Sequence, residues 1–260
     1  MQDSASKFKS KNQKENIYIF LISTLIYIGC FIFAIVQLFN PNYSVSLARL
    51  IILQSIGCTM IPLAFPLLEK VFNVTLHLSI KLFLVLFGLL NCLFGEVMEF
   101  YYVFHWWDDF LHFLSGGGVA MLAFLFMLNY TKKSMSSNRF LMCVVVGIMF
   151  SFSLAVLWEI YEFSADCLFG TNMQKSIPEL DYLFNGGNSS APLLGSDEAI
   201  ANFFRKPDGY RYALMDTMGD FVCCFIGNVV YVIVTIICNK CNALGKMSYY
   251  INYTPDDIEE

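Results

Sequence analysis

The sequence is short of charge, of histidine and of basic clusters. Charged residues make up 14% of the 260 residues and histidine occurs three times, whereas a soluble domain carries about 25% charged residues. The sequence has one basic cluster, a short N-terminal group at Lys7, Lys9, Lys11 and Lys14. Such a group fits a cytoplasmic anchor better than a nucleic-acid-binding arm, so we expect no nucleic-acid partner. The nine cysteines are scattered and indicate no framework of extracellular disulfides.

Long apolar runs dominate what is present. Hydrophobic residues make up 57% of the chain, and its mean hydropathy is +0.58. The runs are long enough to cross a bilayer core of about 30 Å. They are continuous and do not alternate, which argues against a β-barrel. The sequence therefore predicts an all-α, polytopic protein that lies in the lipid bilayer of the cell (inner or plasma) membrane.

About six transmembrane helices are expected, between two polar tails. The tails cover residues 1–16 and 239–260, and the membrane domain covers 17–238. The expected spans are about 17–39, 47–68, 77–100, 108–130, 140–165 and 212–238. Residues 166–211 then form a long outer loop, and loops of that length are commonly functional or disordered.

Three stretches place acids or histidine at the ends of predicted spans. They are His105–His112, Trp158–Asp166 and Asp216–Asp220, and two more acids, Glu96 and Glu99, end the third span. Within each stretch, residues three or four apart share one face of a helix. Ionisable side chains inside a membrane are costly, face the protein interior and mark function. We therefore expect the three clusters to meet.

The distribution of basic residues predicts cytoplasmic N- and C-termini. With six spans and the N-terminus inside, Lys70, Lys132, Lys133, Arg139 and Lys240 all fall on the cytoplasmic side, and the two short outer loops carry almost no basic residue. An excess of lysine and arginine marks that side of a membrane protein. This orientation puts all the acidic clusters at the outer face, where a polar substrate group could reach them.

The acids outnumber the cations expected near them, which favours a bound metal ion. An oxygen-rich set with one or two imidazoles suits Mg²⁺ or Mn²⁺, or Zn²⁺ if His112 binds it. Glu159 or Glu162 is then the expected catalytic general base, acting on a metal-bound water. The expected metal ligands are Asp108, His112, Asp216 and Asp220.

Other residues near the clusters have less specific expectations. Asp109 and His105 are expected to face the head groups, whereas Glu96 and Glu99 fit either the site or the interface. The small residues of Ser115–Gly118, Gly219 and Gly227 predict close packing between helices.

The site residues resemble motifs of the YjdF-like bacterial inner-membrane proteins. The matching pattern is Asp108-x-x-x-His112-Phe-x-x-Gly116, Glu159-x-x-Glu162, Gly170-x-x-x-Gln174 and Asp216-Thr-x-x-Asp220. The resemblance covers about residues 80–235. That family counts as a domain of unknown function, so it implies a membrane topology and a choice of residues but no reaction. The stretch between Gln174 and Asp216 is longer here than in the family pattern, so we expect what the loop recognises to differ.

Three functions stay open on the sequence. The first is a metal-dependent hydrolase or transferase that acts on an amphiphilic or lipid-linked substrate, with the long loop as a lid. The second is a cation- or proton-coupled transporter, against which we count the absence of an internal repeat and of a matching polar cluster at the cytoplasmic side. The third is a non-catalytic membrane scaffold or partner subunit, in which the polar groups only lock helices together.

Overall fold

The protein is a bundle of long helices, seen here in a computed structural model that describes residues 2–104, 106–130, 137–174, 207–241, 243 and 251–253. The helices are α1 (Gln2–Gln37), α2 (Val45–Val71), α3 (Leu78–Leu89), the π-helix η1 (Leu90–Val97), α4 (Phe100–Val103), α5 (Trp107–Tyr130), α6 (Ser137–Phe169) and α9 (Pro207–Lys240). Within these described residues, six segments are long and apolar enough to cross a membrane. This confirms the prediction of an all-α protein with six spans.

The six spans lie where the sequence predicts them, but their ends differ. Helix α1 begins at Gln2, so it includes residues 2–16, which we expected as a separate tail. Helix α6 continues to Phe169, and α9 begins at Pro207, ahead of the predicted start at 212. Of the predicted outer loop, residues 175–206 lie outside the described residues.

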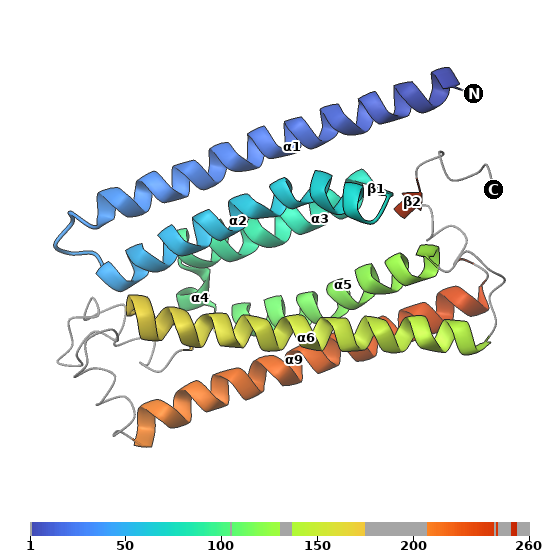
Figure 1. The fold of residues 1–260 in the computed structure, drawn as a ribbon. Helices are drawn as coiled ribbons and strands as arrows, with labels where there is room; N and C mark the ends of the chain where they lie inside the picture. Colours follow the sequence, from blue (N-terminus) through green and yellow to red (C-terminus); the bar gives the residue numbers. More distant parts are fainter. Residues whose placement is uncertain are drawn as a thin grey trace.

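The spans form two groups of three (Figure 1). The first group contains α1, α2 and the span made of α3 and η1, and α2 packs against both of the others. The second group contains α5, α6 and α9, which all pack against one another. Because α5 also contacts η1, the two groups meet along this helix. The three stretches that carry the predicted site residues belong to α5, α6 and α9 of the second group.

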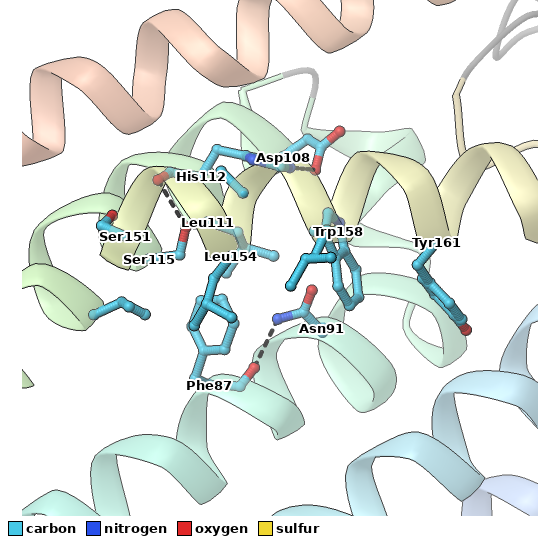
Figure 2. Close-up of a pocket in the computed structure, with 13 residues that line it drawn as sticks. Phe87, Asn91, Asp108, Leu111, His112, Ser115, Ser151, Leu154, Trp158 and Tyr161 are labelled. Carbon is cyan, nitrogen blue, oxygen red and sulfur yellow. Dashed lines mark hydrogen bonds and ion pairs between the residues drawn. The ribbon is translucent and has the colours of Figure 1, made fainter. Parts of the chain in front are cut away.

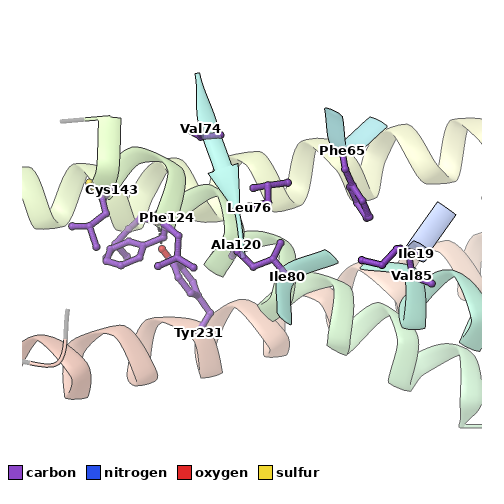
Figure 3. Close-up of a cluster of buried hydrophobic side chains, with 13 residues drawn as sticks. Ile19, Phe65, Val74, Leu76, Ile80, Val85, Ala120, Phe124, Cys143 and Tyr231 are labelled. Atoms are coloured by element: carbon purple, nitrogen blue, oxygen red, sulfur yellow. Dashed lines mark hydrogen bonds between the residues drawn. The ribbon is translucent and has the colours of Figure 1, made fainter. Parts of the chain in front are cut away.

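A hydrophobic cluster joins the two groups (Figure 3). The first group contributes Phe65 and Ile80, and the second contributes Phe124 and Tyr231. Their rings and aliphatic chains are almost fully buried. Tight packing of this kind holds helices together in lipid, where apolar surface gains little from leaving the solvent.

The third span changes its winding as it reaches the candidate site. Helix α3 passes into the π-helix η1, whose wider turns often occur at functional sites. The chain then turns sharply at Glu99, which has a φ of 61°, uncommon for a residue other than glycine. Helix α4 follows and packs Tyr101 so closely over Gly95 that a Cβ at residue 95 would collide with the ring.

Two short strands close the opposite end of the bundle. β1 (Val74–Leu76) lies between α2 and α3, and it pairs antiparallel with β2 (Ile251–Tyr253) near the C-terminus. The start of α1 lies at the same end (Figure 1). The start of α1 and strand β2 are therefore on one side of the bundle, opposite the candidate site.

Candidate functional site

An aspartate–histidine–aspartate group lies between α5 and α9. Asp108 and His112 are one turn apart on α5, and Nε2 of His112 is 3.6 Å from Oδ1 of Asp108. The same nitrogen is 3.6 Å from Oδ1 of Asp220 on α9. The side chains of Asp108, His112 and Asp220 are 13%, 8% and 4% exposed. Two helices far apart in sequence thus bring three metal-ligand types to one buried point.

A second acidic group shares Asp220 with the first. Glu159 and Glu162 come from one face of α6, and each offers an oxygen within 4.8 Å of the others and of Asp220. All three residues are buried. Asp220 therefore links α5 and α6, and the predicted meeting of the three clusters is what the structure shows.

Neighbouring side chains hold the two glutamates in place. Nε1 of Trp158 donates a hydrogen bond of 2.7 Å to Oε1 of Glu162. Oγ1 of Thr217 donates one of 2.8 Å to Oε2 of Glu159. Among the described residues, no hydrogen bond reaches the buried Oε2 of Glu162. One oxygen of Glu162 is therefore fixed by an indole, while the other stays available to a ligand.

Trp158 and Thr217 were not among the residues predicted for the site. Their positions in the sequence could have indicated both residues, because Trp158 is four residues before Glu162 on α6 and Thr217 lies inside the Asp216–Asp220 motif. Neither residue is ionisable, so the pattern of charged residues does not identify them as part of the site.

Asp166 closes the end of α6 and does not join the acidic groups. Its Oδ1 accepts hydrogen bonds from Oγ1 of Thr171 at 2.6 Å and from the amide of Met173 at 2.8 Å, and its Oδ2 accepts one from the amide of Gln174 at 3.0 Å. These bonds fold the chain back so that the side chain of Gln174 reaches Thr217 at 3.5 Å. Asp166 thus orders the segment beside Glu159.

Asp216 lies apart from the other three expected metal ligands. It lies one turn before Asp220 on α9, is half-buried, and belongs to neither of the two groups of potential ligands. It is close enough to interact electrostatically with Glu162. The helical spacing was right, but only the deeper acid of the pair reaches the point where the helices meet.

The remaining predicted residues lie at the edge of the site. Asp109 is exposed and accepts a bond of 3.4 Å from the Cys223 thiol. Glu99 is half-buried at the turn after η1. His105 lies outside the described residues.

Glu96 lies on the side of the site formed by the first group. It is buried on η1, and Nε2 of Gln54 donates a 3.3 Å hydrogen bond to its Oε1. Glu96, Asp108 and Glu162 line one small polar pocket of about 30 Å³. Burial, reinforced by the nearby Asp108 and Glu96, raises the pKa of Tyr101 well above its usual range, so its phenol donates a 2.9 Å bond to Asn91 as a neutral group.

A larger and mostly apolar cavity opens beside the aspartate–histidine group. It has a volume of about 330 Å³ and lies between α3, η1, α5 and α6. Figure 2 shows Asp108 and His112 along one side, with Phe87, Leu111 and Leu154 forming apolar walls. The site is therefore a polar pocket next to an apolar one, with Asp108 and Trp158 lining both.

The opposite end of the bundle holds a polar cluster that the sequence analysis missed. Lys81 is fully buried, and its Nζ lies 2.6 Å from Oδ1 of Asn12, 2.6 Å from Oδ1 of Asn16 and 3.0 Å from Oε1 of Glu69. Glu69 also accepts a bond from the amide of Leu76 in β1. We expected no polar cluster on the cytoplasmic side; this cluster lies at the end of the bundle where α1 begins, and α1 contributes Asn12 and Asn16 to it.

Comparison with known proteins agrees with this membrane architecture. An uncharacterised protein of Thermotoga maritima is 28% identical over 144 residues, which cover 54% of this chain and 70% of that protein. No solved structure matches the chain. The sequence pattern of a family described as "Predicted membrane protein (DUF2238)" matches residues 21–240, and the resemblance to YjdF-like proteins is consistent with it. The chain therefore belongs to the DUF2238 family of predicted membrane proteins.

Proposed function

We propose that this protein is a metal-dependent hydrolase or transferase of the membrane, acting on an amphiphilic substrate. The observation that carries the proposal is the pair of ligand groups that share Asp220, next to a mostly apolar cavity. The site is at the end of the bundle away from the termini. With the termini in the cytoplasm, as the basic residues indicate, it faces the outer side of the cell membrane.

The spacing of the first group supports a metal ion. Ligand atoms bind Zn²⁺ at about 2.0–2.2 Å, so two ligands of a tetrahedral ion are about 3.4 Å apart. His112 Nε2 lies 3.6 Å from an oxygen of both Asp108 and Asp220. Three protein ligands with further positions open to water and substrate are typical of a catalytic metal centre. We therefore assign Asp108, His112 and Asp220 as ligands and leave Asp216 out of the ligand set.

The second group supplies the acid–base function. Glu162 is the stronger candidate for the general base, because its Oε2 accepts no hydrogen bond among the described residues. Oε2 of Glu159 already accepts one from Thr217. A water bound to the ion would ionise more easily, and Glu162 would take its proton as the water attacks the substrate. Glu159 then orients Glu162 and the substrate.

Metal analysis of the purified protein tests this proposal. The protein is stripped of metal, incubated with Mg²⁺, Mn²⁺ or Zn²⁺, and assayed for bound ion beside Asp220→Asn and Asp109→Asn. We expect about one tightly bound ion per chain in the parent and in Asp109→Asn, because Asp109 is exposed and outside both groups. Loss of a ligand should weaken binding by well over the 10–100-fold typical of residues that only support a ligand. Equal binding in both variants, or none in the parent, would contradict the proposal.

A cation or proton transporter is the second candidate, and one observation favours it. Polar clusters occur at both ends of the bundle, around Asp220 and around Lys81, as a pathway across the membrane would require. Cation flux into proteoliposomes distinguishes the two functions. Flux that depends on Asp220 would favour transport, whereas bound metal without flux favours the enzyme.

A further inference from the structure

The apolar cavity beside the candidate site has the form of a slot parallel to the helices. On α5 its wall includes His112, Ser115 and Val119, and on α6 it runs from Ser151 to Tyr161. These residues recur at helical spacing, so they follow one face of each helix. At a rise of 1.5 Å per residue, ten residues of α6 make the slot about 15 Å long. Asp108 and His112 lie along one side of the slot, between Ser151 and Tyr161 (Figure 2).

Three polar side chains in the slot already donate hydrogen bonds within the protein. Oγ of Ser115 donates to the carbonyl of His112 at 2.9 Å, and Oγ of Ser151 donates to the carbonyl of Gly116 at 2.9 Å. Nδ2 of Asn91 donates to the carbonyl of Phe87 at 2.8 Å (Figure 2). Because these donors are satisfied within the protein, the walls beyond Asp108 and His112 present an apolar surface.

The slot is open to the surrounding lipid along α6. Three of its wall residues remain exposed: Leu154 at 40%, Leu157 at 59% and Tyr161 at 36%. The helix is a membrane span, so what these residues face is the hydrocarbon of the bilayer. A molecule could therefore pass sideways from the membrane into the slot without its chain crossing water.

We propose that the slot holds one hydrocarbon chain of an amphiphile, whose head group lies against Asp108 and His112. The inference rests on the proposed function, and it specifies the substrate class as a molecule with a single chain in the site. The volume fits this occupant. An apolar cavity of about 150 Å³ binds one benzene molecule, so about 330 Å³ accommodates roughly a dozen carbon atoms.

Fluorescence quenching tests for a chain in the slot. Trp158 lines the slot, and Phe substitutions at Trp106 and Trp107 leave it as the only tryptophan. The probe is dodecanol with bromine on the carbons next to its hydroxyl end, because bromine quenches an indole that it touches. Its neutral head allows the measurement on metal-free protein. A matched reporter replaces Trp158 with Phe and Ile160 with Trp, since Ile160 is 55% exposed and is not part of the slot.

We expect saturable quenching at Trp158 and non-saturable quenching at the Ile160→Trp reporter, which senses only probe dissolved in the surrounding lipid. Val119→Phe and Ala155→Phe each fill part of the slot from a different helix. Each should weaken the Trp158 response by about tenfold, because it removes room for about two methylene groups. Elution profile and melting temperature identify a filled variant that has not folded. The inference is overturned if a folded filled variant quenches like the parent, or if both reporters respond alike.

A series of brominated alcohols of increasing chain length tests the same inference without filling the slot. Affinity at Trp158 should rise with length and level off near the dodecyl chain, when the slot is full. A continued rise in parallel with partitioning into lipid would overturn the inference. These results are separate from the metal assay: metal binding without a chain site refutes only this inference, whereas a chain site without metal binding refutes the proposed catalysis.

Discussion

The contact between α5 and α9 determines the geometry of the aspartate–histidine group. A single added methyl group at this contact would push the two helices apart. At Gly116 a Cβ would collide with the carbonyl oxygen of Cys224 and lie 2.8 Å from its Cα. Gly116 is one turn after His112, and Cys224 is one turn after Asp220. We therefore predict that Gly116→Ala separates the ligand atoms themselves.

The size of the effect follows from these distances. An ordinary contact is at least about 3.4 Å, so relieving the contact with Cα alone requires the two helices to move apart by about 0.6 Å, and the carbonyl oxygen requires more. Transmitted to the next turn, this movement increases the separation of His112 and Asp220 from 3.6 Å to about 4.2 Å, well beyond the approximately 3.4 Å between two ligands of one tetrahedral ion. We expect metal affinity to fall at least about tenfold, and overpacking to cost about 1–3 kcal/mol of stability.

Gly219→Ala is the matched control, on the other helix of this contact, α9. It lies beside Asp220, yet a Cβ there would meet no atom within 4 Å. This substitution should preserve metal affinity and raise the melting temperature slightly, since alanine favours a helix by about 0.5–1 kcal/mol over glycine. The assay is metal titration of the stripped protein beside thermal unfolding. If Gly116→Ala binds metal as tightly as Gly219→Ala, the close approach of α5 and α9 does not set the geometry of the site.

Two further substitutions test the ends of the bundle. Lys81→Met should lower the stability by about 3–5 kcal/mol, because it leaves the carboxylate of Glu69 without its buried cation. Thermal unfolding measures this loss, and a variant that melts at the same temperature as the parent would refute the prediction. Asp166→Asn should lower the stability by about 1–3 kcal/mol, because it weakens the charge-assisted bonds from Thr171 and the following amides. Ser164→Ala serves as its control on α6, since this exposed hydroxyl bonds only within its own helix, and an equal loss in both variants would exclude the assigned role of Asp166.

Helical spacing made much of the site predictable. The lengths of the apolar runs predicted the six spans. The four-residue offset between Asp108 and His112 predicted that they share one face of a helix, as they do on α5. Small residues also predicted the close contact of Gly116 and Gly227 with the neighbouring helix, which the structure shows. The same argument failed at Gly219, where no atom lies near. Spacing along one helix says which residues share a face, but it does not say which turn of that face meets a neighbour.

Contacts between helices explain the other differences. Asp216 and Asp220 share a face of α9. How α9 packs against α5 and α6 decides that Asp220 joins the groups of potential ligands. The burial of Glu96 depends on the winding of η1, for which the sequence carries no simple periodic signal. Lys81 was overlooked because one charge in an apolar run stands out less than a cluster, and its partners come from α1 and α2.

X-ray absorption of the zinc-loaded protein tests most directly whether the residues around Asp220 form a metal site. The proposed ligands are one imidazole nitrogen and carboxylate oxygens, so the spectrum should show only nitrogen and oxygen neighbours at about 2.0–2.2 Å. Substitution of Asp220 by Asn should abolish this signal at equal protein concentration. Sulfur neighbours at about 2.3 Å would instead place the ion on some of the nine cysteines. That result, or a protein that takes up no zinc, would contradict the assignment of Asp108, His112 and Asp220.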